Sequence, residues 1–170
     1  MIRVDLDNEM QVRAAEKGLT RAIRYIPQWE GVTVKRNFQH DRERLNFPAF
    51  VMQQTEAVGA ELSVKKYFKL DLEDQEDKNY KNKADAQLQH LGLEVKWTKW
   101  KDGSLILTEL DRKEDIAILV TGTAPTYYLA GWIPISVARR PQRQRADGSW
   151  WLSQSDLHPM ANLQRSSHAV

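Results

Sequence analysis

Three side chains in the middle of the chain, Asp85, Glu94 and Lys96, have the types and the spacing that a hydrolytic metal site needs. Glu94 and Lys96 lie in the short apolar segment 93–97. Side chains of a strand alternate between its faces, so these two point one way while the apolar residues around them point the other. If residues 84–86 open a partner strand and the chain turns back afterwards, Asp85 comes close to Glu94. Two carboxylates and a lysine can then hold a divalent metal ion and a water molecule.

A second Glu-x-Lys copy, Glu76-Asp77-Lys78, shows how little this tripeptide means alone. It lies in the polar run 71–79, with no apolar strand around it, and we interpret that run as a solvated loop. Average composition gives roughly one accidental copy in a charged chain of this length. The copy at Glu94 differs in its apolar flanks and in the acidic residue upstream.

The composition indicates a soluble globular protein. The chain has 170 residues, a formal net charge of +2 and no cysteine, which excludes disulfides and thiolate metal sites. No window resembles a membrane span, and the N-terminus has no secretory signal pattern, so we expect a cytoplasmic protein without membrane contact. Residues 1–160 are expected to form one domain, and residues 161–170 a frayed tail.

The periodicity of apolar residues predicts a first helix over residues 8–26. Asp7 or Asn8 is its expected cap, and Pro27 its expected end. Its predicted apolar face consists of Ala15, Leu19, Ala22, Ile23 and Ile26.

A second helix is predicted from residue 49 to about residue 68. Glu61 falls inside its apolar band and should face the sheet. A buried carboxylate is costly enough to require a partner or a metal ion. Glu56 projects toward the more polar side of the helix, and we interpret it as a surface charge.

Beyond the polar run the pattern changes to short strands, which predicts an α/β fold with a mixed sheet. Asp102-Gly103 predicts a hairpin between the second and third of them. Segment 116–120 is continuously apolar and is expected at the centre of the sheet. The strands are expected at about residues 83–87, 92–98, 104–109, 115–121, 126–133 and 150–152.

In this arrangement the chain resembles the PD-(D/E)XK nuclease superfamily, whose D-x(n)-E-x-K core is matched by Asp85, Glu94 and Lys96. The likeness covers most of residues 49–160 and is strongest to small bacteriophage nucleases, including junction-resolving endonucleases. Two features depart from the pattern: no Pro-Asp dipeptide at Asp85, and an extra polar stretch at 87–90. The resemblance implies a restriction-endonuclease-like sheet flanked by helices, working as a Mg²⁺-dependent deoxyribonuclease in the host cytoplasm if the chain is phage-encoded.

The resemblance also implies a role for each residue. Asp85 and Glu94 would bind Mg²⁺, for which Mn²⁺ can substitute, with the Val95 carbonyl as a third protein oxygen. Lys96 would hold or help deprotonate the attacking water. Glu61 matches the helix glutamate that often joins the superfamily's active site, where it would bind a second metal ion or orient Lys96 and water.

DNA is the expected partner, because basic clusters flank the site in sequence and neutralised phosphates release counterions. Junction resolution would also call for a homodimer. The predicted nucleic-acid contacts are Lys65, Lys99, Trp100, Lys101, Arg139, Arg140, Arg143 and Arg145.

Two other readings stay open. Lys96 could simply pair with a carboxylate on an exposed sheet face. The whole chain could also be a non-catalytic nucleic-acid-binding or inhibitor protein on a nuclease-like scaffold. The sequence has no P-loop, no histidines at metal-motif spacing and no serine nucleophile elbow.

Overall fold

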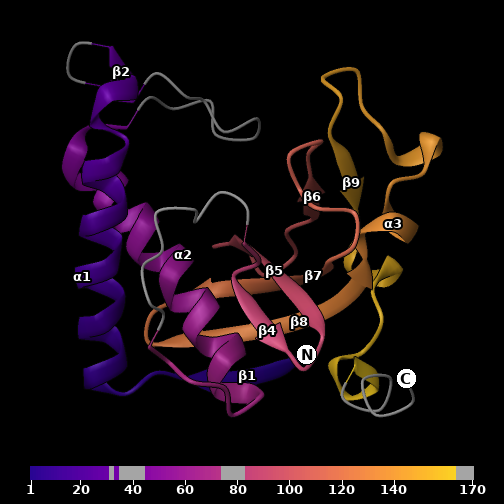
Figure 1. The fold of residues 1–170 in the computed structure, drawn as a ribbon, viewed down its shortest axis with the longest axis horizontal. Coiled ribbons are helices and arrows are strands. Elements are labelled where there is room, and N and C mark those ends of the chain that lie inside the picture. Colours follow the sequence, from indigo (N-terminus) through magenta and orange to yellow (C-terminus); the bar gives the residue numbers. More distant parts are fainter. Residues whose placement is uncertain (31–32, 35–44, 74–82, 164–170) are drawn as a thin grey trace.

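The computed structural model describes residues 1–30, 33–34, 45–73 and 83–163. A short strand and two long helices come first, and a five-stranded mixed sheet that includes this strand forms the middle of the molecule (Figure 1). A small sheet of two strands, formed by residues 105–107 and 150–152, packs on the face of the large sheet opposite the two helices. The predicted class, α/β with a mixed sheet, is confirmed.

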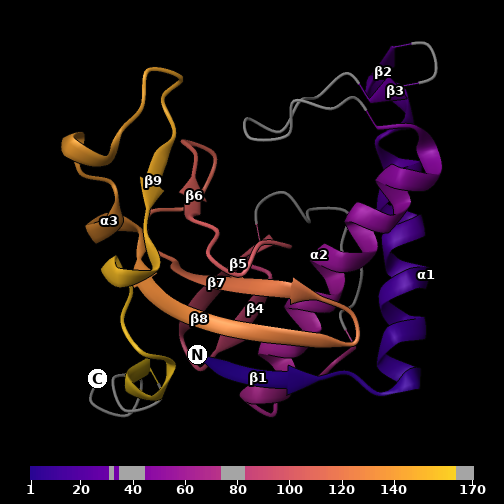
Figure 2. The same cartoon turned by 180° about the vertical axis from the view of Figure 1, so that it is seen from behind.

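The large sheet has the strand order β1-β8-β7-β5-β4 and curls visibly in both views (Figures 1 and 2). β5 and β7 are parallel, whereas the other neighbouring pairs are antiparallel. β7 is the central strand, as its apolar sequence predicted, and residues 116–121 are all buried. The strands are β1 (Ile2–Asp5), β4 (Ala86–Leu88), β5 (Leu91–Thr98), β7 (Ile116–Thr123) and β8 (Thr126–Pro134).

The hairpin predicted at Asp102-Gly103 between two adjacent strands is wrong. A turn does form there, since the Gly103 N–H donates to the Trp100 carbonyl over 3.0 Å. Beyond the turn, however, the chain leaves the large sheet. β6 (Leu105–Leu107) pairs with β9 (Trp150–Leu152), beside the short helix α3 (Ile135–Ala138).

Alternate residues of β7 face two separate cores. Its even-numbered apolar residues share a core with α1 and α2, whereas Ala117 and Leu119 share one with β6, β9 and α3. Leu93 of β5 belongs to the first core. Because β5 and β7 run in register, Glu94 lies beside Ala117 and Lys96 beside Leu119. The predicted alternation along β5 is therefore confirmed, with both charged residues on the side of the small sheet.

α1 (Asn8–Arg24) begins where the sequence predicts, and the Asp7 side chain accepts the Met10 N–H over 2.9 Å. It ends earlier than predicted and is followed by η1 (Ile26–Gln28) and by the two-stranded sheet of β2 (Trp29–Glu30) and β3 (Thr33–Val34).

α1 packs against α2 (Phe47–Tyr67) through small residues. A Cβ atom on Gly18 would lie 2.4 Å from Thr55 Oγ1, so the helices approach too closely for a side chain there. The predicted apolar face is wrong apart from Ala22, because its larger members, such as Leu19 and Ile23, are exposed. The buried residues of α1 are Met10, Ala14, Gly18 and Ala22.

The C-terminal segment is ordered further than predicted. Residues 161–163 continue a helical turn that begins at Met160, and Leu163 is buried in the larger core, so the expected fraying is wrong for these residues. Residues 164–170 and 74–82, with the second Glu-x-Lys copy, lie outside the described residues. Within the described parts, no helix is long and apolar enough to cross a membrane.

Candidate active site

A tight hairpin places Asp85 opposite Glu94. β4 and β5 are antiparallel, and Ala86 pairs with Leu93. Asp85 precedes Ala86, so the same register puts it across from Glu94 and on the same face. The Val95 N–H donates to Asp85 Oδ2 over 2.7 Å, which fixes the carboxylate against β5. The proximity predicted from the sequence is thus present.

The polar stretch 87–90 does not separate the two carboxylates. Gln87 and Leu88 pair within β4, and Leu88 lies opposite Leu91, so only Gln89 and His90 form the turn. Gln89 adopts a positive φ of 54°, which suits a two-residue hairpin loop. The stretch is therefore part of the hairpin and holds Asp85 in register.

The carboxylates of the site repel one another. Burial raises the pKa of Asp85 well above its usual value, and the charges of Glu61 and Glu94 raise it further, against an opposing effect of Arg21. Burial also raises the pKa of Glu94, although Lys96 opposes this. A cation bound between the carboxylates would relieve the repulsion.

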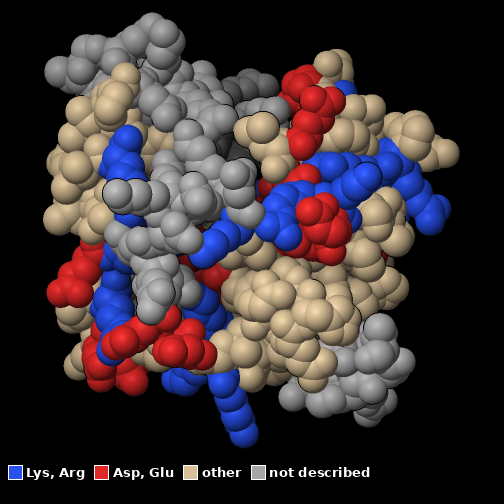
Figure 3. All heavy atoms as spheres, in the orientation of Figure 1, with Lys and Arg blue, Asp and Glu red and all other residues tan. Residues whose placement is uncertain are grey.

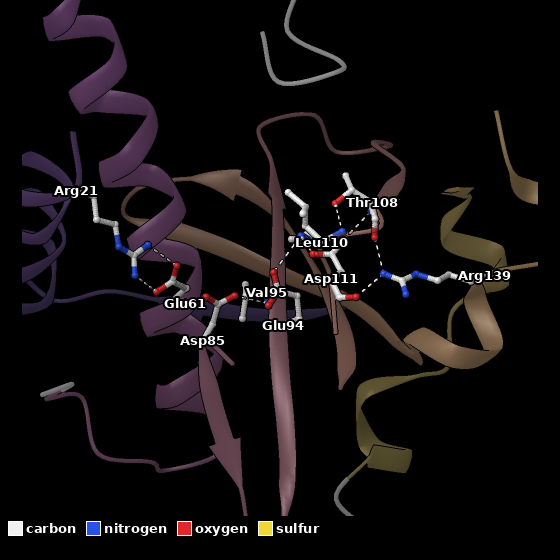
Figure 4. A network of polar contacts seen from close by, with 10 residues as sticks. Arg21, Glu61, Asp85, Glu94, Val95, Thr108, Leu110, Asp111 and Arg139 are labelled. Atoms are coloured by element: carbon white, nitrogen blue, oxygen red, sulfur yellow. Dashed lines mark hydrogen bonds and ion pairs between the residues drawn. The ribbon is translucent and has the colours of Figure 1, made fainter. Parts of the chain in front are cut away.

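Glu61 has the partner that its burial demanded, and the partner is Arg21 of α1 (Figure 4). Two parallel hydrogen bonds of 2.6 and 2.7 Å join the guanidinium to the two carboxylate oxygens. Figure 4 shows Glu61 lying between Arg21 and Asp85. Sequence reasoning missed Arg21, because its partner is 40 positions away and periodicity marks no such pairing.

Lys96 is shared between two carboxylates. Its Nζ donates to Glu94 Oε1 over 3.0 Å and to Asp111 Oδ1 over 2.5 Å. Burial alone would lower the pKa of Lys96, but these two carboxylates outweigh it and raise the pKa above its usual value. Lys96 is therefore a cation and a hydrogen-bond donor at neutral pH. Asp111 was absent from the predicted site.

Asp111 lies in the turn after β6 and is itself fixed by the chain around it (Figure 4). Its second oxygen, Oδ2, accepts the Thr108 N–H over 2.7 Å. Arg139 donates to the Thr108 carbonyl over 2.5 Å and also to the Asp111 carbonyl. The Arg139 guanidinium lies 5.1 Å from the centre of the Trp150 ring, which joins this turn to β9.

The predicted nucleic-acid contacts divide into exposed and enclosed residues. Lys65 is only 2% exposed, and Arg139 is engaged with the turn beside Asp111, so neither presents a free surface charge. Arg140 and Arg145 are exposed near β9, and the Arg145 guanidinium stacks 3.6 Å from the Trp151 ring centre. Arg143 is half-buried and lies 3.4 Å from Asp156.

The turn after β5 carries the exposed aromatic residue that the sequence singled out. Trp100 is 62% exposed, and Lys99 Nζ lies 4.8 Å from the centre of its ring. Lys101 is exposed next to it. Figure 3 shows Lys and Arg atoms forming a band from the middle of this face toward the side where Figure 1 places α3.

Glu56, interpreted from the sequence as a surface charge, is instead half-buried. It accepts the Tyr127 hydroxyl over 2.6 Å and the Ala124 N–H over 3.0 Å. Its role is to fix the β7–β8 turn against α2.

The groups that could bind a metal ion are the carboxylates of Asp85 and Glu94, with the Val95 carbonyl as a third oxygen. Among the residues that the structure describes, no three or more His, Asp or Glu side chains form a group that could hold a metal ion. Mg²⁺ usually takes only one or two protein carboxylates and completes its shell with water and phosphate oxygens. Two carboxylates on one face of the sheet could serve Mg²⁺ in this way, with water and substrate oxygens completing its shell.

No family model matches the chain, and no curated protein or solved structure is significantly similar to it.

Proposed function

We propose that this protein is a divalent-metal-dependent nuclease that hydrolyses DNA phosphodiester bonds, with a restriction-endonuclease-like fold of the PD-(D/E)XK type. One observation carries the proposal: the β4–β5 hairpin sets Asp85 opposite Glu94, and Lys96 follows on the same face. The position of Glu61 beside this pair, from the preceding helix, adds support.

Each residue of the site can contribute to phosphodiester cleavage. Asp85, Glu94 and the Val95 carbonyl would hold Mg²⁺ or Mn²⁺, which supplies charge neutralisation and a water of lowered pKa when bound. Lys96 donates hydrogen bonds and would offset the charge on the phosphate. Because Lys96 is already protonated, it would hold the attacking water rather than take its proton.

Exposed cations near the site support nucleic acid as the substrate. Arg140, Arg145 and Lys101 can each neutralise a phosphate, and Trp100 offers an aromatic face for stacking on a base. These residues come from the β5–β6 turn and from the segment between α3 and β9. Resolution of a four-way junction would require two active sites, one for each opposite strand, and a homodimer would supply them.

A specific observation favours a second candidate, a non-catalytic nucleic-acid-binding protein. Glu61 and Lys96 are already neutralised within the chain, by Arg21 and Asp111 respectively. Such a protein would bind DNA in a salt-sensitive manner that does not depend on metal.

Cleavage of end-labelled duplex, single-stranded, flap and four-way-junction DNA tests the proposal. The reactions contain Mg²⁺, Mn²⁺ or EDTA, and the variants are Asp85→Asn, Glu94→Gln and Lys96→Met. We expect metal-dependent cleavage of at least one substrate by the native protein and loss of cleavage in all three variants. Glu16→Gln, which neutralises an exposed carboxylate on α1, is the matched control and should stay active.

DNA binding, measured by fluorescence anisotropy in the same buffers, separates the two candidates. A nuclease with a disabled site should still bind DNA in the Lys96→Met variant. If the native protein binds DNA equally well with EDTA and cleaves none of the substrates with either metal, the binding protein is the correct assignment.

A further inference from the structure

Asp111 is arranged as a fixed anion directed at Lys96. Asp111 is only 8% exposed, and its Oδ1 lies 2.5 Å from Lys96 Nζ. Oδ2 is occupied by the Thr108 N–H, and the Asp111 carbonyl is held by Arg139. Both the side chain and the backbone of Asp111 are therefore held in place before any substrate arrives.

Lys96 needs such an anchor, because a lysine has a flexible four-carbon stem that leaves its ammonium many positions to occupy. Glu94 also holds it, at 3.0 Å, but Glu94 is a proposed metal ligand. A carboxylate that binds a cation shares its charge with that cation and attracts a second cation less. Asp111 comes from a different element and is not among the proposed metal ligands.

We infer that Asp111 is a positioning residue, which holds the Lys96 ammonium at the site when Glu94 is engaged elsewhere, and that Arg139 fixes Asp111 for this task. The catalytic consequence of this inference rests on the proposed function. The contact between Asp111 and Lys96 does not depend on that function, because it exists whatever the protein does.

The alternative is that Asp111 only stabilises its own turn, through the Thr108 N–H. The isosteric variant Asp111→Asn separates the two roles. Its amide oxygen can still accept the Thr108 N–H, but the variant offers Lys96 no negative charge. Asp115→Asn is the matched control, because Asp115 is equally enclosed, at 2% exposed, and pairs with Arg112 rather than with Lys96.

The first test is the ¹H–¹⁵N signal of the Lys96 ammonium, assigned by its absence in Lys96→Met. A held, half-buried ammonium exchanges its protons slowly enough to be observed. We record this signal in a Glu94→Gln background, in which the charge of Glu94 no longer attracts the ammonium. There we expect the signal with Asp111 intact and in Asp115→Asn, and its loss in Asp111→Asn, with the backbone amide spectrum of the same samples confirming that each variant is folded. A Lys96 signal that persists in folded Asp111→Asn would overturn the inference.

The second test is kinetic. Asp111→Asn should lower kcat by about 10- to 100-fold, as is typical of residues that orient a functional group, and leave KM for DNA unchanged. Asp115→Asn, which leaves the contact between Asp111 and Lys96 intact, should keep the native kcat. An equal fall of kcat in both variants would mean that Asp111 does not act through Lys96 and would overturn the inference.

The two failures can be told apart. If the native protein cleaves no DNA, the proposed function fails, but the ammonium signal still decides whether Asp111 holds Lys96. If cleavage is present and the signal is insensitive to Asp111→Asn, the positioning role fails and the nuclease assignment stands.

Discussion

Replacing Arg21 by methionine should expose how strongly the fold depends on one buried ion pair. The Glu61 side chain is 7% exposed, and Arg21 donates to both of its oxygens. Removing one member of a buried pair costs about 3–5 kcal/mol, because the other charge stays behind without compensation. The Arg21 side chain is 24% exposed, so water can reach part of the site. We therefore expect the lower end, about 3 kcal/mol.

The measurement is urea unfolding near neutral pH, with EDTA, followed by fluorescence. A loss of about 3 kcal/mol is a large part of the roughly 5–15 kcal/mol that stabilises a typical domain. It should lower the melting temperature by about 6–12 °C in a chain of this size. The double variant Arg21→Met/Glu61→Leu should regain most of the loss, because it leaves no buried charge.

Arg13→Met is the matched control for this prediction. Arg13 pairs with Glu9, four residues away on the same helix, and with Glu73, and the side chains of both partners are 76% exposed. Water screens such a pair, so its loss should change the stability little. If Arg21→Met is no more destabilising than Arg13→Met, the Arg21–Glu61 pair does not compensate a buried charge and the reasoning is wrong.

Three further predictions concern the hairpin and the β7–β8 turn. Because the pKa of Asp85 is raised, the folded chain holds the Asp85 proton more tightly than the unfolded chain. The free energy of unfolding should therefore fall as the pH rises from about 4 through the raised pKa. Asp85→Asn should reduce this pH dependence, measured by urea unfolding with EDTA at each pH. Saturating Mg²⁺ should raise the melting temperature of the native protein near neutral pH but not that of Asp85→Asn, and equal shifts in both would place the ion elsewhere. Gly59→Ala should lower the free energy of unfolding by about 1–3 kcal/mol, because the new methyl would lie 2.1 Å from the Tyr127 hydroxyl oxygen. If the double variant Gly59→Ala/Tyr127→Phe regains none of this stability, the clash is not the cause.

The elements that carry the hairpin could be predicted because their signals are local. Alternation over 93–97 marked β5, an unbroken apolar run marked β7, and turn residues marked their ends. From these patterns alone, Asp85 could be placed near Glu94. β1 was missed, because a four-residue edge strand near the start of the chain has too short a pattern and pairs with β8, far away in sequence.

The partners of the site could not be predicted, because they depend on distant pairings. Arg21 reaches Glu61 because Gly18 lets α1 approach α2 closely, and in this packing the buried face of α1 is rotated from the expected one and shares only Ala22 with it. Asp111 reaches Lys96 only because β6 leaves the large sheet to pair with β9, where the local turn signal at 102–103 predicted a hairpin.

Arg21 and Asp111 change the charge balance of the site. Sequence patterns identify Asp85, Glu94, Lys96 and Glu61, which together resemble an acidic metal site with one lysine. In the fold, Arg21 pairs with Glu61 and Asp111 pairs with Lys96, so Glu61 and Lys96 each have a partner of opposite charge within the chain. Asp85 and Glu94 lie across from each other with raised pKa values, although Lys96 also donates to Glu94, and a cation bound between the two carboxylates would relieve their repulsion.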